Sequence, residues 1–143
     1  MVIARRARWQ RIAGVGMAGI AVVLGGAGVA RGHSLPDVPS DRPGNFADAA
    51  YSTLIISGLV AWVVAIVLLH SGWRAAHGPS ALLWWATVSL VLSPLALWGS
   101  LALIRLTEGL LPVAVAGILF VAAPVSLVVG VACLVLLFRY RAA

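Results

Sequence analysis

Residues 14–32 read GVGMAGIAVVLGGAGVARG, and small residues recur along this stretch at alternating steps of four and three. The small positions are Gly14, Ala18, Ala21, Gly25, Gly28 and Gly32. On an α-helix these steps place all six residues on one face, because residues three and four apart are surface neighbours. Such a face carries almost no side chains, so a second helix can approach it closely. The stretch therefore predicts a membrane helix built for tight contact.

The whole chain is too apolar for a soluble domain. Of its 143 residues, 62 % are hydrophobic and only 10 % are charged, whereas soluble domains have roughly half and a quarter. A bilayer core needs roughly 20 apolar residues per helix. Four such runs are present, at residues 12–31, 53–70, 81–104 and 112–138. Because the connections are short, we expect one all-α membrane domain, residues 1–143, folded as an antiparallel four-helix bundle that contacts the lipid bilayer.

Arginine placement predicts the orientation. The ten basic residues are all arginine and lie mostly at helix ends, which indicates membrane topology and not a nucleic-acid surface. Seven lie on one side of the predicted spans, before the first, in the second connection and after the last: Arg5, Arg6, Arg8, Arg11, Arg74, Arg139 and Arg141. The positive-inside rule therefore predicts a multi-pass protein of the plasma (inner) membrane with both termini cytoplasmic.

Residues 1–31 also have features of a secretory signal, with a basic start and small residues at Gly28 and Ala30. The apolar run is longer than an ordinary signal core. We therefore expect this segment to be retained as the first membrane helix.

The other three runs repeat the small-residue pattern. It includes Gly58, Ala61 and Ala65 in the second run, and Ala116, Ala123, Ser126, Gly130 and Cys133 in the fourth. The third run shows it most clearly, with Ala86, Ser89, Ser93, Ala96 and Ser100 on one face. A period near 3.5 residues favours left-handed packing at small crossing angles. These faces are predicted to contact neighbouring helices or a partner protein.

Three residues near the middle of the spans are unusual. Pro94 and Pro124 each remove a backbone hydrogen bond, and each is either a hinge or an ordinary kink; we expect the Ser93 hydroxyl to satisfy the carbonyl that Pro94 frees. Trp62 needs an acceptor for its indole N–H, because lipid tails offer none. Trp62 therefore marks a packed interface or a ligand pocket, or simply fills volume between helices.

Polar residues on the outer side have ordinary explanations. Arg105 and Glu108 are three residues apart and are expected to anchor the third helix at the interface, with an anionic ligand on Arg105 as the alternative. The proline-rich connection 32–52 predicts an exposed loop, in which Asn45 would cap the second helix. Its His and Asp residues show no spacing that gathers three of them into a metal site.

No motif in the sequence indicates chemistry. The spans lack central charged residues, there is no CxxC pair and no phosphate-binding glycine loop, and Cys133 is the only cysteine. We expect no catalytic residue, no cofactor and no metal. The leading hypothesis is a non-catalytic accessory or assembly subunit that packs against other membrane subunits.

Two alternatives stay open. One is a small homo-oligomeric transporter or channel whose path is lined by the serines of the spans: Ser57, Ser89, Ser93, Ser100 and Ser126. The other is a membrane enzyme acting on a lipid or quinone, with His70, Arg74 and His77 as its polar cluster.

Overall fold

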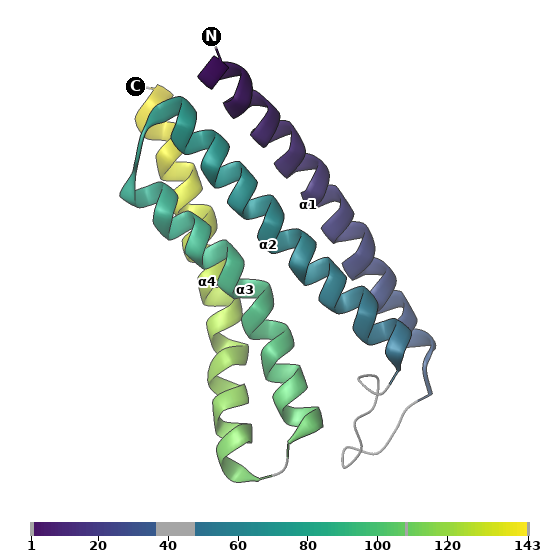
Figure 1. Cartoon of the computed structure of the whole chain (residues 1–143). Coiled ribbons are helices and arrows are strands. Elements are labelled where there is room, and N and C mark those ends of the chain that lie inside the picture. The colour runs from purple at the N-terminus through teal and green to yellow at the C-terminus, as the bar shows by residue number, and fades with distance from the viewer. Residues whose placement is uncertain (1, 37–47, 108, 143) are drawn as a thin grey trace.

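The computed structural model describes residues 2–36, 48–107 and 109–142, and its regular structure there is four helices. They are α1 (Val2–Ser34), α2 (Ala49–His77), α3 (Ala81–Leu106) and α4 (Leu110–Ala142) (Figure 1). Each is long and apolar enough to cross a membrane. The described part of the chain is thus an all-helical protein with four candidate membrane spans.

The helices extend beyond the apolar runs from which we predicted them. α1 already begins at Val2, so the arginines at its start lie on the helix and not before it. α2 continues to His77, which we had expected in a loop, and the inner connection shrinks to 78–80. Backbone hydrogen bonding does not stop where the hydrocarbon ends. α2 ends only at Gly78, where φ of 82° turns the chain out of the helix.

α1 and α2 form an antiparallel hairpin with a seven-residue repeat at its contact face. The buried positions of α1 are Ala7, Gly14, Ala21 and Gly28, and those of α2 include Tyr51, Gly58, Ala65 and Gly72. A Cβ placed on Gly58 would lie 3.0 Å from the backbone nitrogen of Gly25. The backbones of α1 and α2 therefore approach so closely at this point that little room remains for a side chain on Gly58.

α3 and α4 form the second antiparallel hairpin in the same way. Its buried positions include two series that are again seven apart, Ala86, Ser93 and Ser100 in α3 and Ala116, Ala123, Gly130 and Leu137 in α4. A Cβ on Gly130 would meet Leu90 Cγ at 2.9 Å and Ser89 Cβ at 3.3 Å. Small residues thus serve one purpose in both hairpins, which is to bring two helices together.

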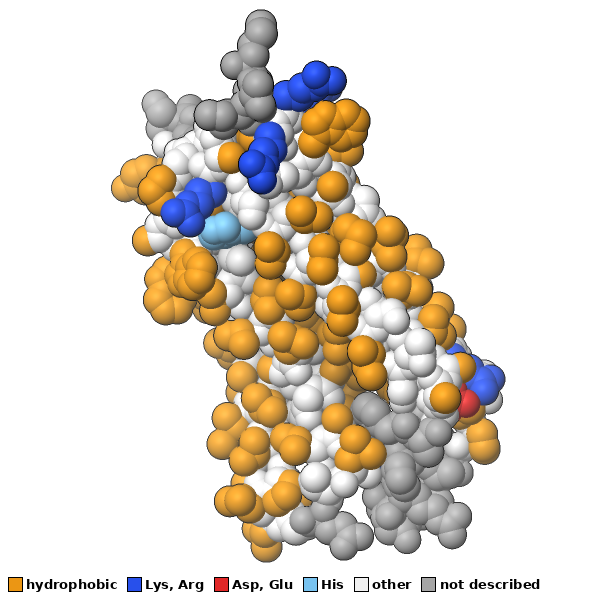
Figure 2. Space-filling view, in the orientation of Figure 1, with side chains coloured by type: hydrophobic (Ala, Val, Ile, Leu, Met, Phe, Trp, Pro, Cys, Tyr) orange, Lys and Arg blue, Asp and Glu red, His pale blue; other side chains and the backbone are white. Residues whose placement is uncertain are grey.

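The two hairpins meet mainly along α2 and α3, at a shorter contact than either hairpin has inside it (Figure 1). α1 begins and α4 ends at the same end of the molecule (Figure 1). Figure 2 shows basic side chains gathered at that end and hydrophobic side chains over most of the visible length. Whether a closed bundle forms in a bilayer, with both termini cytoplasmic, stays a prediction.

Candidate functional site

The hairpins are joined at mid-span by a hydrogen bond from Trp62 to the backbone of α3. The Trp62 indole Nε1 donates to the Leu90 carbonyl oxygen at 2.9 Å. Leu90 is four residues before Pro94, so its carbonyl is the one that the proline leaves without a backbone donor. We had assigned this task to Ser93, and the structure gives it to Trp62 because the indole of the adjacent hairpin lies within reach. The Trp62 indole thus gains an acceptor, and the carbonyl that Pro94 frees gains a donor.

A second polar link lies two turns further along α2. His70 Nδ1 is 2.7 Å from Thr87 Oγ1, and this hydroxyl in turn donates to the Leu83 carbonyl at 2.8 Å. When the Thr87 hydroxyl donates to Leu83, it accepts from the His70 tautomer that carries its proton on Nδ1. The ring of His70 also meets the Trp84 ring edge-on at 6.0 Å. His70 is therefore held against α3 by both a hydrogen bond and a ring contact.

Aromatic pairs also connect the two hairpins, near both ends of the contact between them, which we call the junction. Near the start of α2, the Tyr51 and Trp98 rings meet edge-on at 6.3 Å. Near the end of α2, Trp73 meets Phe138 of α4 edge-on at 5.1 Å. These contacts tie α2 to both helices of the second hairpin.

A cavity of about 320 Å³ lies between the two hairpins, in the half of the molecule that holds the start of α1 and the end of α4 (Figure 1), and all four helices line it. Its wall is almost wholly apolar and includes Val15, Ile66, Ala86, Leu90, Leu134 and Phe138. The side chains of Arg11, His70, Trp73 and Thr87 complete the lining. Arg11 contributes the only charge, and it also borders an adjacent hollow that Arg8 lines.

Two further hollows lie along the contact between the hairpins, nearer the end of α1 and the start of α2. A hollow of about 130 Å³ is lined by Trp62 and Pro94 together with Gly25 of the small-residue stripe. A more open one of about 370 Å³ lies beside His33, Tyr51 and Trp98. Residues of α1, α2 and α3 line both of these hollows.

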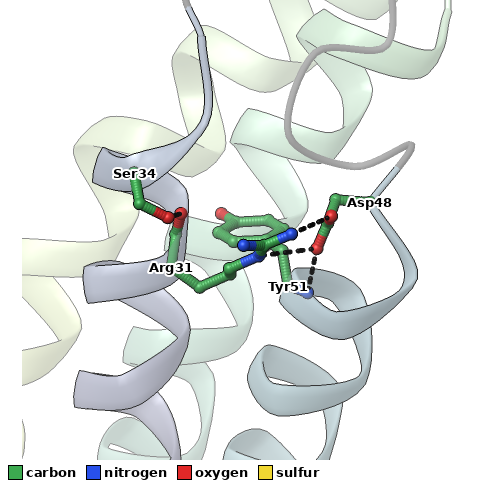
Figure 3. A network of polar contacts seen from close by, with 4 residues as sticks. All are labelled: Arg31, Ser34, Asp48 and Tyr51. Atoms are coloured by element: carbon green, nitrogen blue, oxygen red, sulfur yellow. Dashed lines mark hydrogen bonds and ion pairs between the residues drawn. The ribbon is translucent and has the colours of Figure 1, made fainter.

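Where α1 ends and α2 begins, the first hairpin carries an ion pair that the sequence analysis did not predict (Figure 3). Arg31 Nη2 lies 2.9 Å from Asp48 Oδ2, and Asp48 Oδ1 accepts from the Tyr51 backbone N–H at 2.7 Å. Asp48 is thus the N-cap of α2, in place of Asn45, which lies outside the described residues. A cap adjacent to the helix start was detectable from the residue type, whereas the pairing with Arg31 depends on how α1 ends.

The hydrogen bond from Arg31, together with that from Tyr51, holds the pKa of Asp48 below its ordinary value of 3.8. A lowered folded-state pKa means that the unfolded chain binds the proton more tightly. The contribution of this ion pair to folding is therefore present above about pH 4 and is lost as the pH falls through the folded-state pKa.

Most predicted contact residues face a helix of the same chain. Gly14, Ala21 and Gly28 are buried against α2, while Ala18, Gly25 and Gly32 flank them and are partly exposed. In α3, Ala86, Ser89, Ser93 and Ser100 are buried, and Ala96 is partly exposed. Ser100 donates to the Leu97 carbonyl at 2.7 Å. The structure therefore gives these serines a packing role and offers the transport hypothesis no supporting observation.

The remaining candidates do not gather into one site. Arg105 and Pro124 are exposed, and Glu108 lies outside the described residues, so the expected Arg105–Glu108 pair does as well. His77 is stacked on Trp73 at 4.9 Å, and Arg74 is exposed. The described residues contain no group of three or more His, Cys, Asp or Glu that could hold a metal ion.

Comparison of the chain with known protein families, with curated proteins and with solved structures finds no match.

Proposed function

We propose that this chain is a non-catalytic subunit or assembly factor of a larger complex in the plasma membrane. In this proposal it spans the membrane four times with both termini cytoplasmic, and a further membrane helix packs against α1. One observation supports it above the others, namely a second set of glycines on α1, Gly16, Gly19 and Gly26, that none of the described residues of other helices contacts.

The contrast between two sets of glycines carries the argument. A Cβ on Gly14, Gly28, Gly58, Gly72 or Gly130 would lie within 3.1 Å of a neighbouring helix. A Cβ on Gly16, Gly19 or Gly26 would have nothing within 4 Å, and these three glycines are exposed. Glycine lowers helix stability and offers lipid little surface, whereas it allows close approach of another membrane helix. The open face is therefore the surface at which we place a partner helix.

The test is co-purification of the tagged protein from its native membrane in mild detergent. We expect a membrane partner in stoichiometric amount, and we expect Gly19→Leu and Gly26→Leu each to lose it because leucine blocks the close approach. Both variants should keep the fold, since nothing lies near the added side chain.

Ala13→Leu is the matched control, because it adds similar bulk at an exposed position off this face. A monodisperse protein without a partner would contradict the proposal. So would partner retention by the glycine variants equal to that of Ala13→Leu.

A further inference from the structure

We propose that the cavity between the two hairpins binds one anionic phospholipid, with an acyl chain inside and the headgroup phosphate on Arg11. None of the three open glycines of α1, Gly16, Gly19 and Gly26, lines this cavity. Three observations support lipid binding there: the apolar wall of the cavity, the hydrogen bonds that its polar side chains already make, and the positive charge of Arg11 at its edge.

The wall suits hydrocarbon better than a polar ligand. Besides Arg11 and Trp73, the side chains with polar atoms in the wall are His70 and Thr87, which are bonded to each other, and the Thr87 hydroxyl also bonds to the Leu83 carbonyl. What the cavity offers is a largely apolar surface contributed by four helices, with a volume of about 320 Å³. Burial of an acyl chain there needs no hydrogen-bond partner.

The edge of the cavity suits an anion. Arg11 is held in place by its aliphatic stem, which packs against Gly72, where an added Cβ would lie 2.9 Å from Arg11 Cγ. Arg8 shares the adjacent hollow with Arg11. The ion pair found among the described residues, Arg31–Asp48, lies at the opposite end of the hairpin. No described acid therefore neutralises Arg11, and a phosphate would supply the missing charge through charge-assisted hydrogen bonds.

The experiment is native mass spectrometry of the purified full chain in mild detergent with equimolar phosphatidylglycerol and phosphatidylcholine. We expect one phosphatidylglycerol retained per chain in preference to phosphatidylcholine. Arg11→Gln should weaken retention about tenfold, as expected for loss of a hydrogen bond to a charged group. Arg74→Gln is the matched control, because Arg74 carries the same charge at the same end but does not line the cavity.

A second variant tests the cavity itself. Val15→Phe should reduce retention of both lipids by filling the space, and because Val15 is exposed on one side it should leave the fold intact. Glycerol 3-phosphate should not compete, since it lacks the acyl chains. Equal retention of both lipids, or equal effects of Arg11→Gln and Arg74→Gln, would overturn the proposal. Gly26→Leu should leave lipid retention unchanged, which separates this test from that of the partner helix.

Discussion

Trp62 and Pro94 each place a hydrogen-bonding group that needs a partner in the middle of a membrane helix. The indole has a donor without an acceptor, and the proline leaves the Leu90 carbonyl without a donor. A hydrogen bond of 2.9 Å from the Trp62 indole Nε1 to the Leu90 carbonyl oxygen gives each group its partner. Because neither group can turn to water within lipid, the pair also sets how α2 and α3 are placed along each other.

This pairing predicts a specific non-additivity. Trp62→Phe should lower the free energy of unfolding by about 1 kcal/mol through the lost hydrogen bond, in addition to the lost volume. In a Pro94→Ala background the new backbone N–H can bond to the Leu90 carbonyl, so Trp62→Phe should cost less there. The measurement is unfolding of the four variants in mixed micelles, followed by circular dichroism.

Trp85→Phe serves as the control, because Trp85 is exposed and bonds to nothing across the junction in the described residues. An equal cost of Trp62→Phe in both backgrounds would show that Trp62 contributes volume alone.

At the scale of the elements, the seven-residue repeat of small residues determines which face of each helix is buried. In the first hairpin, glycines at the contact let the backbone of one helix touch that of the other, as at Gly58 against Gly25. The same helix α1 also carries glycines with open space around them, such as Gly26. The cost of adding a side chain should therefore differ sharply between positions of the same residue type.

We expect Gly58→Val to destabilise the protein by about 1–3 kcal/mol, because the added atoms meet backbone that cannot move without separating α1 from α2. Gly26→Val makes the identical change where nothing lies within 4 Å and should be close to neutral. Thermal unfolding of both variants in detergent gives the comparison. Similar melting temperatures for the two would refute tight packing at Gly58.

At the scale of the whole molecule, two hairpins with long internal contacts share a shorter contact with each other. Small residues dominate inside the hairpins, whereas large aromatic residues and polar links join them. Large side chains keep the helices further apart, which leaves room for the cavity of about 320 Å³. The same arrangement exposes the outer faces of α1 and α4.

Arginine placement predicts the orientation in the membrane, and cysteine labelling can test this prediction. In a Cys133→Ser background, Thr107→Cys should react with a membrane-impermeant maleimide in intact cells, because the α3–α4 connection is predicted to be outside. Ser80→Cys, in the α2–α3 connection, should react only after permeabilisation. The opposite labelling pattern would reverse the topology.

The sequence by itself determined the four apolar helices, and it predicted faces of small residues for contact between helices. Both are local properties: lipid requires every backbone group to be bonded within its helix, and the spacing of small residues along Gly14–Gly32 is the contact pattern itself. The need of Trp62 for an acceptor and the carbonyl freed by Pro94 were likewise visible in the sequence, but as two separate features.

Only the tertiary structure joined those two features, paired Arg31 with Asp48 and formed the cavity beside His70 and Arg11. It also showed that one glycine face of α1 is occupied by α2 while another is open. Such juxtapositions depend on the offset and tilt between helices far apart along the chain. No local pattern encodes that offset, because it results from the packing of all the side chains at the junction together.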